Sequence, residues 1–483
     1  MTVRERTLSP RQAAAVEAYY RSADVRERIF EFCGGDPFTC EYTVGFGEPL
    51  VRRGFRRPIK LAADRAGFEQ LMEEGLDLFR SVWDRKGTLA VWDVEYFNLD
   101  TWRGLYRRQV EYFELMEPSY QAIRSLLRRY GIGHINDTTS SGYHFLSFIP
   151  FSSPVHRKLE RIGFLEPELA AKYSQRRHDD AKRLRRLPLR AGLGYSGMGR
   201  LHEFLSQAVI FRTRGLTPIP VTVSDTAVSR SKRGREGMSM DITQYADPLY
   251  MRDIRTTFST HQKHKVYIGR VGAALAESMP VYATVPRGDL EIRDLYRIRR
   301  RLAAAAEYAR GCSGVIPDAS AGWERLIDDY RRSSLFSFHR DFDAVPQYPR
   351  SRWAETYLGL DLDKLPPCVA QALRNPNWSL LVPTNIRNLC RFFLSLGWHP
   401  KHIAGLLRAR YEEDLGWDTD WNKYDPSTRA DFWARVYCGM VRTGADDLAD
   451  FNCIAHQSRG FCPNHWCGQR LEDYRERLQA RTA

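Results

Sequence analysis

The chain has 483 residues, which is too long for one ordinary hydrophobic core, so we expect two or three domains. Its content of 43% hydrophobic and 12% aromatic residues is typical of a globular chain and excludes a disordered one. No apolar stretch of about 18 residues is present, and the charged N-terminus lacks the apolar core of a secretory signal. The sequence therefore predicts no contact with a membrane and a cytoplasmic, reducing location.

Positive charge is in excess along the chain. The formal net charge is +14, from 73 Lys and Arg against 59 Asp and Glu, and the pI is about 9.4. The arginines gather in clusters at residues 52–57, 176–190, 230–235 and 297–301. Such clusters suit the phosphates of a nucleic acid better than evenly spread charge does. The sequence favours a nucleic-acid partner, although many basic proteins bind none.

An acidic strand follows the first predicted helices, which cover residues 8–34 and 68–82. Residues 89–98 (LAVWDVEYFN) are rich in β-branched and aromatic side chains, which predicts a strand. Side chains alternate between the faces of a strand, so Asp93 and Glu95 share one face about 7 Å apart. Like charges this close repel each other unless a cation such as Mg²⁺ or Mn²⁺ lies between them. The alternative is a solvent-facing polar edge of an amphipathic strand.

A helix over residues 106–130 and strand patterns at 133–137 and 140–150 come next. The second of these strands carries Ser141-Gly142-Tyr143-His144. A glycine on a strand allows a phosphate to approach the backbone, and His144 can donate a hydrogen bond to a triphosphate oxygen. Taken alone, a histidine on a strand is more often a structural residue.

Residues 155–190 are basic and predicted to be helical. Gly192–Gly197 then match G-x-G-x-x-G, but no buried strand precedes them, so we interpret the motif as a turn and not as a dinucleotide site. A short strand over residues 236–242 contains a third acid, Asp241.

Cations and hydroxyl groups are dense in residues 251–268. If this stretch is extended, Ser259, His261, Lys263 and Lys265 share a face that, with Arg255, could bind phosphate. The alternative is a solvated basic face. A helix is predicted over residues 290–311, a connecting segment over 311–359, and helices over 385–396, 400–411 and 427–443.

Cysteines are concentrated near the C-terminus. In a reducing compartment the nine cysteines are not expected to form disulfides. The spacing Cys453-x8-Cys462-x4-Cys467 is typical of thiolates that bind zinc or an iron–sulfur cluster. The best fourth ligand is Cys368, which follows two prolines, with Cys438 in reserve. Cys390, Cys33 and Cys40 are interpreted as buried free thiols.

The acidic, serine–histidine and single-acid motifs together resemble those of the archaeo-eukaryotic primase superfamily, in the same order. The matching residues are Asp93-Val94-Glu95, Ser141-Gly142-Tyr143-His144 and Met240-Asp241. The resemblance covers about residues 40–300 and implies an RRM-like core that performs two-metal nucleotidyl transfer. It implies that Asp93, Glu95 and Asp241 hold Mg²⁺ or Mn²⁺, and that Ser141, Gly142, His144, Arg255, Ser259, His261 and Lys263 bind the nucleotide. Glu95 stands where the family more often has aspartate, which changes the reach of that carboxylate.

The C-terminal part is similar to the C-terminal domain of the primase large subunit. The matching features are Pro366-Pro367-Cys368, the helix from Asn385 through Arg387 to Gly397, and Cys453, Cys462 and Cys467. The resemblance covers about residues 360–470. It implies a [4Fe–4S] cluster on Cys368, Cys453, Cys462 and Cys467, in a helical domain that helps to engage template and initiating nucleotide. Zinc is the alternative metal.

The sequence thus predicts an α/β (α+β) catalytic domain over residues 1–310, a connecting segment over 311–359 and an all-helical metal-cluster domain over 360–483. The expected activity is that of a primase–polymerase, which builds primers on single-stranded DNA from nucleoside triphosphates. The alternatives are a gap-filling or end-joining repair polymerase that cannot initiate, and an inactive nucleic-acid-binding protein. Because no G-x-x-x-x-G-K-[ST] motif is present, a replicative helicase would act in trans.

Overall fold

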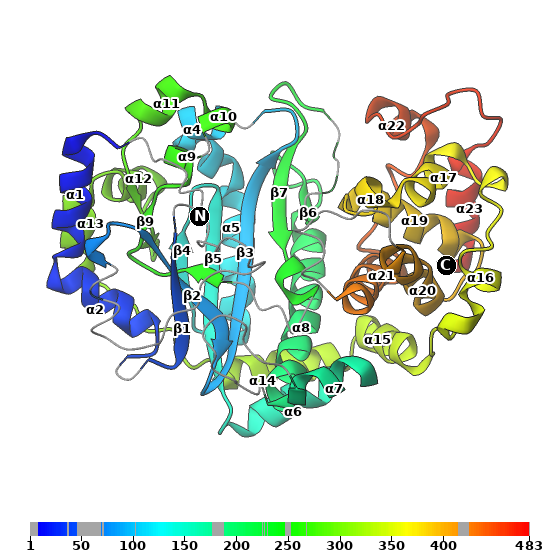
Figure 1. Cartoon of the computed structure of the whole chain (residues 1–483), viewed down its shortest axis with the longest axis horizontal. Coiled ribbons are helices and arrows are strands. Elements are labelled where there is room, and N and C mark those ends of the chain that lie inside the picture. The colour runs from blue at the N-terminus through cyan, green and yellow to red at the C-terminus, as the bar shows by residue number, and fades with distance from the viewer. Residues whose placement is uncertain are drawn as a thin grey trace.

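A mixed β-sheet surrounded by helices is the central feature of the computed structural model of this chain (Figure 1). The structure describes residues 8–35, 38–45, 69, 72–101, 103–175, 188–224, 226, 228, 230–246, 253–266, 268–413 and 425–482. With 56% of its residues in helices and 14% in strands, the chain belongs to the mixed α/β class, as the sequence predicts.

Nine of the strands in the described part of the chain form one sheet, and β9 and β10 form a separate pair. The strands are β1 (Cys40–Gly45), β2 (Asp77–Asp84), β3 (Gly87–Asn98), β4 (Ile135–Thr138), β5 (Gly142–Pro150), β6 (Val221–Val223), β7 (Glu236–Asp241), β8 (Asp253–Arg255), β9 (Thr260–His261), β10 (Tyr282–Ala283) and β11 (Val285–Pro286). The main path runs β1-β2-β3-β5-β4-β11, β7 joins β3, and β8 joins β2. Strand β6 runs parallel to β7, whereas the other pairs are antiparallel.

Strand β3 occupies the middle of the sheet. One edge pairs with β5 and the other with β7, whereas β2 pairs with it only beside the β2–β3 hairpin. Every residue of β3 is buried except Asp93 and Glu95, which are half-buried. An apolar strand that is covered on both faces is therefore accessible only where its two acids stand.

The helices of the N-terminal part pack around this sheet. They are α1 (Pro10–Tyr20), α2 (Ala23–Phe32), α4 (Arg103–Arg107), α5 (Gln109–Tyr130), α6 (Pro154–Ile162), α7 (Pro167–Gln175), α8 (Leu189–Thr213), α9 (Lys263–Val266), α10 (Ile268–Val271), α11 (Ala273–Ser278), α12 (Ile292–Arg299) and α13 (Leu302–Ala309), with a 3-10 turn η1 (Thr243–Ala246). Helices α5 and α8 contact β3, while α1, α2 and α13 group together beyond β1 and β2 (Figure 1).

Helix α8 overturns one prediction, because the glycine motif expected to be a turn lies inside this helix. A Cβ atom on Gly192 would come within 2.2 Å of the Tyr173 ring, and one on Gly197 within 2.3 Å of the Leu159 carbonyl oxygen. Glycine is required because α6 and α7 approach the backbone of α8 closely. The motif serves helix packing, and its periodicity is hidden because α8 is buried on nearly all sides.

Three other predicted elements differ in detail. Residues 77–82, predicted as part of a helix, belong to β2, which is buried along its whole length and therefore lacks the alternation of a half-exposed strand. The helix predicted over residues 8–34 is broken between α1 and α2, and the one over 290–311 between α12 and α13. The helix over 106–130 and the strands that became β3, β4, β5 and β7 are confirmed.

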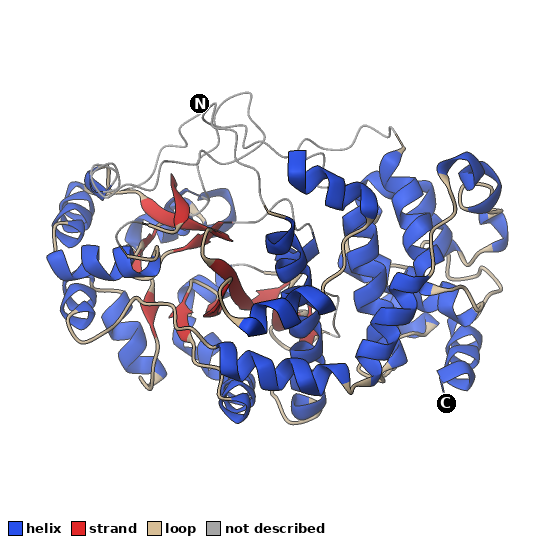
Figure 2. Ribbon diagram, turned by 90° about the horizontal axis from the view of Figure 1, so that it is seen from below, coloured by secondary structure: helices blue, strands red, loops and turns tan. Residues whose placement is uncertain are grey.

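The remaining described elements are helices, and Figure 2 shows the strands confined to one half of the molecule. They are α14 (Ser320–Arg331), α15 (Ser334–Ala344), α16 (Trp353–Thr356), α17 (Pro367–Arg374), α18 (Pro376–Ser379), α19 (Pro383–Ser395), α20 (Pro400–Glu412), α21 (Pro426–Arg442), α22 (Cys453–Ser458) and α23 (Leu471–Thr482), with 3-10 turns η2 (Arg350–Arg352) and η3 (Leu362–Lys364).

Both halves of the molecule pack against the segment between them. Residues 311–359, predicted as a connecting segment, contain α14, which contacts α5, α6 and α8, and α15, which contacts α20 and α21. Buried ion pairs also cross from α8 to the C-terminal helices. Glu203 accepts hydrogen bonds from Arg435 at 2.5 Å and 3.0 Å, and Arg200 lies 2.8 Å from Asp343.

Candidate active site and cysteine cluster

Four ionisable side chains stand in one row across four neighbouring strands. Asp241 on β7 lies opposite Asp93 on β3, Asp93 opposite His144 on β5, and His144 opposite Asp137 on β4. Directly opposite residues point to the same face of a sheet, with Cβ atoms about 5 Å apart. Glu95, two residues beyond Asp93, shares this face. The register thus brings Asp241, Asp93 and Asp137, which are far apart in the sequence, into one row.

A cavity of about 290 Å³ opens over this row. Its walls come from β2, β3, β5, β7, η1, β8 and β9 and from the turn before β5. The lining residues are Phe79, Val91, Asp93, Glu95, Thr139, Ser140, His144, Asp241, Gln244, Asp253, Ile254, Arg255, His261 and Lys263. Of the sequence-predicted residues, the cavity brings together the three acids, His144, Arg255, His261 and Lys263.

His144 is held beside the acids. Its Nε2 lies 3.4 Å from Oδ1 of Asp93, and the side chain is 11% exposed. Burial lowers the pKa of His144, but Asp93 and then Glu95 and Asp137 outweigh burial, so the pKa is raised. The protonated imidazole is therefore favoured, which makes it a hydrogen-bond donor toward an anion in the cavity.

Ser141 and Gly142 stabilise the strands and do not line the cavity. The Ser141 hydroxyl donates a hydrogen bond of 3.0 Å to Oε1 of Glu95. A Cβ atom on Gly142 would lie 1.8 Å from the Val94 carbonyl oxygen. The glycine therefore permits close pairing of β3 and β5, in contrast to its predicted role of admitting a phosphate to the backbone.

Arg255 and Ser259 are tied into the protein. The Arg255 guanidinium lies 2.6 Å from the Asp77 carboxylate and donates to the Thr260 carbonyl oxygen at 2.8 Å. It lines the cavity, but Asp77 already balances its charge. Ser259 does not line the cavity: its hydroxyl accepts from the Leu78 amide and donates to the Thr260 carbonyl oxygen.

His261 and Lys263 line the cavity, although the extended face predicted for them is wrong. The strand β9 covers only Thr260 and His261, and helix α9 begins at Lys263. Lys265 consequently points elsewhere, and its ammonium donates to the carbonyl oxygens of Ala276 and Glu277. Burial, followed by the nearby cations, lowers the pKa of His261 well below its usual value, so it is neutral at pH 7.

Sequence reasoning missed several residues of this region. Asp253, Gln244, Thr139 and Ser140 line the cavity, and Asp137, beyond His144 in the row, has no exposed surface. Asp137 could have been found from the β4–β5 hairpin, because a tight turn at 139–142 places it opposite His144. Asp253 carried no comparable signal, since its strand is only three residues long.

The carboxylates fit a divalent cation in the chemistry of their oxygen atoms. Asp93 and Asp241 place like charges side by side on neighbouring strands, which is unfavourable without a cation. Carboxylate oxygens are also the donors that Mg²⁺ prefers, and that Mn²⁺ accepts. In the part of the chain that the structure describes, no three His, Cys, Asp or Glu side chains already converge on one point. The acids would have to turn toward one another to share an ion.

The arginine clusters predicted to contact nucleic acid are only partly described. Residues 52–57 and 176–187 lie outside the described residues. In the cluster at 230–235, Arg233 pairs with Glu236 and Arg235 with Asp100, each at 2.8 Å. Arg299 of the last cluster is buried. The predicted DNA-binding surface therefore stays a prediction.

Four cysteines of the C-terminal part lie near one another. Cys368 stands in the first turn of α17, Cys453 begins α22, and Cys462 and Cys467 follow on the segment before α23. The sulfur atoms of Cys453 and Cys467 both lie 3.7 Å from the Gln469 carbonyl oxygen. Burial, and after it Cys462, Cys453 and Cys467, raise the pKa of Cys368 to about 12.

The other cysteines lie apart from this group. Cys438, the reserve ligand, is fully buried beside Cys390, and burial followed by Cys390 raises the pKa of its thiol. Cys33, Cys40 and Cys390 are buried free thiols, as predicted, and none of the nine cysteines forms a disulfide. Thiols that raise one another's pKa are difficult to ionise together without a metal. The group at 368, 453, 462 and 467 therefore fits a soft metal or an iron–sulfur cluster in its donor atoms.

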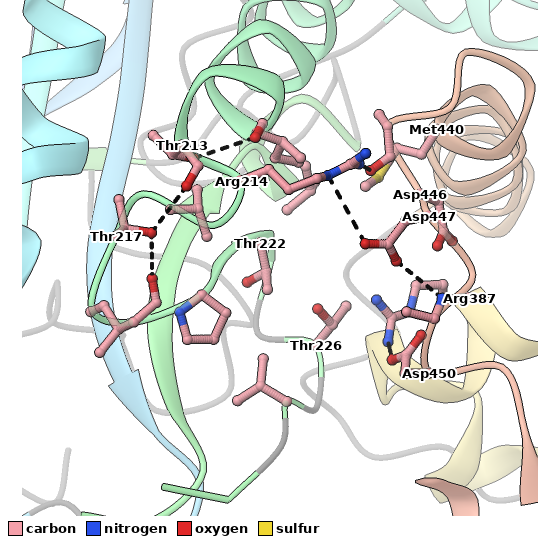
Figure 3. A pocket seen from close by; sticks show the side chains of 18 of the residues that line it. Thr213, Arg214, Thr217, Thr222, Thr226, Arg387, Met440, Asp446, Asp447 and Asp450 are labelled. Carbon is pink, nitrogen blue, oxygen red and sulfur yellow. Dashed lines mark hydrogen bonds and ion pairs between the residues drawn. The ribbon is translucent and has the colours of Figure 1, made fainter.

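A larger cavity, of about 470 Å³, separates the segment around β6 from the C-terminal helices (Figure 3). Arg214 faces Asp447 across it, and Arg387 lies 2.7 Å from Asp450. Arg391 and Arg459 also pair with acids there, at 2.5–2.7 Å. Nearly every arginine of this cavity is therefore paired with an acid. The cavity is for that reason less suited to binding an anion than its number of arginines suggests.

No helix in the described ranges is both long and apolar enough to cross a membrane. Comparisons of the chain with protein-family models, with curated proteins and with solved structures found no match.

Proposed function

We propose that the chain is a DNA-directed primase–polymerase that joins nucleoside triphosphates on a single-stranded template. The observation that carries this proposal is the row in which Asp241 stands opposite Asp93, with Glu95 on the same face and His144 3.4 Å from Asp93. This row supports a centre of the primase superfamily type, which needs three acids from two separate strands and a neighbouring histidine. The antiparallel β4, β5, β3 and β7 are compatible with the RRM-like core.

The acids would hold the Mg²⁺ or Mn²⁺ ions that this chemistry requires. When bound, such ions lower the pKa of an attacking 3′-hydroxyl and neutralise charge on the triphosphate. Ser141 supports the site by donating to Glu95, which fixes one carboxylate oxygen. Thr243 does the same for Asp241, since its amide and its hydroxyl donate to Oδ1 at 2.8 Å and 2.5 Å. Both hydrogen bonds reduce the freedom of the acids before any ion arrives.

The other cavity residues would orient the triphosphate. His144, whose pKa is raised, can donate from Nε2, and Lys263 brings a cation to the same cavity. Arg255 also lines this cavity, where Asp77 balances its charge. Orientation by several such donors lowers the barrier by holding the reacting groups in line.

For the C-terminal part we propose a [4Fe–4S] cluster on Cys368, Cys453, Cys462 and Cys467, with zinc as the alternative. The proximity of the four thiols supports this assignment. We further propose that this part is an all-helical domain that helps to engage the template or initiating nucleotide.

An incorporation assay tests the function directly. Purified protein is mixed with single-stranded DNA and Mg²⁺ or Mn²⁺, with rNTPs or dNTPs, both without a primer and with an annealed primer. We expect labelled products without a primer. The double variant Asp93→Asn/Glu95→Gln should lose incorporation while it retains DNA binding, whereas Glu355→Gln, at an exposed carboxylate of α16, should keep both.

The outcomes separate the alternatives. Products only from primed templates would assign a repair polymerase that extends but does not initiate. DNA binding without any incorporation would leave an inactive nucleic-acid-binding protein. If Asp93→Asn/Glu95→Gln still incorporates nucleotides at the parental rate, the acids do not form the centre and the proposal fails.

A further inference from the structure

A buried acid lies on the far side of His144 from Asp93 and Asp241 in the row across the strands. Asp137 on β4 is directly opposite His144, and it has no exposed surface. Among the residues that the structure describes, none is a hydrogen-bond partner of either carboxylate oxygen of Asp137. Carboxylates are rarely buried completely without a partner, because removal from water is costly for the charged form. The complete burial of Asp137 without a hydrogen-bond partner therefore requires an explanation.

The neighbouring imidazole also has a buried nitrogen without a hydrogen-bond partner among the described residues. His144 Nδ1 is buried and has no hydrogen-bond partner either, whereas Nε2 is the nitrogen beside Asp93. Burial raises the pKa of Asp137 to about 7, and Thr257 and His144 oppose this rise. Of Thr257 and His144, only His144 has a basic side chain. An unsatisfied acceptor and an unsatisfied ring nitrogen thus lie side by side on one face of the sheet.

We infer that Asp137 is a positioning residue for His144. Its carboxylate accepts a hydrogen bond from Nδ1–H of His144 and so holds the ring with Nε2 beside Asp93 and facing the cavity. This inference rests on the proposed function for the role of His144, but the contact itself does not. A buried acid that accepts from one nitrogen of a histidine ring holds the ring against rotation and so fixes where the other nitrogen points.

A purely structural acid would have a different effect on the stability of the protein. A carboxylate that holds the fold together through good hydrogen bonds lowers stability when it is removed. A carboxylate whose main contact is to an active-site histidine lowers stability by being there, because it is a buried charge with few partners. We therefore expect Asp137→Asn to melt at the same temperature as the parent or higher.

The contact can be tested without activity, by proton NMR of the full chain. A buried imidazole N–H that is hydrogen-bonded to a carboxylate exchanges slowly and gives a signal at low field. We expect one such signal that is absent from His144→Gln and also from Asp137→Ala. The control Ser206→Ala, at a buried hydroxyl of α8 that also lacks a partner, should retain it. A signal that persists in Asp137→Ala would overturn the inference.

The functional part uses a double-mutant cycle on the KM for the nucleotide. Asp137→Ala should raise KM about 10-fold with a smaller change in kcat, and Asp137→Asn, which keeps an acceptor, should recover part of the loss. In a His144→Gln background the same substitution should change KM less than about 2-fold, because the group it positions is gone. Equal effects in both backgrounds would refute the positioning role. Absence of incorporation in the parent would refute the proposed function, and the NMR result would still decide the contact.

Discussion

The contact between the two halves of the chain predicts a measurable loss of stability when Glu203 is neutralised. This carboxylate of α8 is 2% exposed and lies 2.5 Å from Arg435 and 3.0 Å from His339. Burial raises its pKa, but Arg435 and then His339 outweigh burial and lower the pKa to about 2. The difference from an ordinary value of 4.5 corresponds to about 3 kcal/mol of folding free energy.

The substitution Glu203→Gln should remove about this amount. It leaves the Arg435 guanidinium, whose side chain is 11% exposed, without its counter-charge, and breaking a buried pair in this way typically costs about 3–5 kcal/mol. For 483 residues the entropy of unfolding is about 1 kcal/mol/K. If the chain unfolds in one transition, its Tm should fall by about 3 °C.

Scanning calorimetry of parent and variant at pH 7 and at lower pH provides the test. Since the folded pKa is lowered, the stabilisation is complete above the unfolded pKa near 4.5 and is lost as the pH falls toward 2, so the two melting temperatures should converge there. Glu168→Gln is the matched control, because Glu168 pairs with Arg408 at 3.1 Å but is 69% exposed and should contribute less than about 1 kcal/mol. A Glu203→Gln variant that melts within about 1 °C of the parent at pH 7 would refute the reasoning.

Three further predictions concern the site and the cysteines. Gly142→Ala should destabilise the protein by about 2–3 kcal/mol in chemical denaturation, because its Cβ meets the neighbouring strand, whereas Gly269→Ala, with open space around it, should change little. Mn²⁺ should raise the Tm of the parent more than that of Asp93→Asn, and equal shifts would contradict the cation site. Cys368→Ser should lose bound iron or zinc by elemental analysis and visible absorbance, while Cys438→Ser keeps it; metal retained in Cys368→Ser would exclude this ligand.

Local patterns in the sequence predict much of the fold. Strand β3 and helix α5 carry clear periodicities, and both lie where they are expected. Helix α8 could not be predicted in the same way, because a helix that is buried on nearly all sides has no polar face to reveal its period. Strand β2 was mistaken for a helix for a related reason, since both of its faces are buried.

The sequence predicts which residues belong to the candidate site better than it predicts what each of them does there. Motif order pointed to Asp93, Glu95 and Asp241, but only the register of β3 with β7 places the third acid opposite the first. Register between strands that are far apart in sequence depends on tertiary packing, which no short motif encodes. Ser259 shows the opposite failure, since its type suits a phosphate but its hydroxyl serves the backbone of β2 and β9.

Helix α8 is synthesised long before the helix that carries the partner of its buried carboxylate. Glu203 leaves the ribosome roughly 230 residues before its partner Arg435. At about 5–20 residues per second the nascent chain waits about 10–50 s with that carboxylate unmatched. A polypeptide that stops short of α21 never acquires the match, which makes truncated products natural targets for chaperones and proteases.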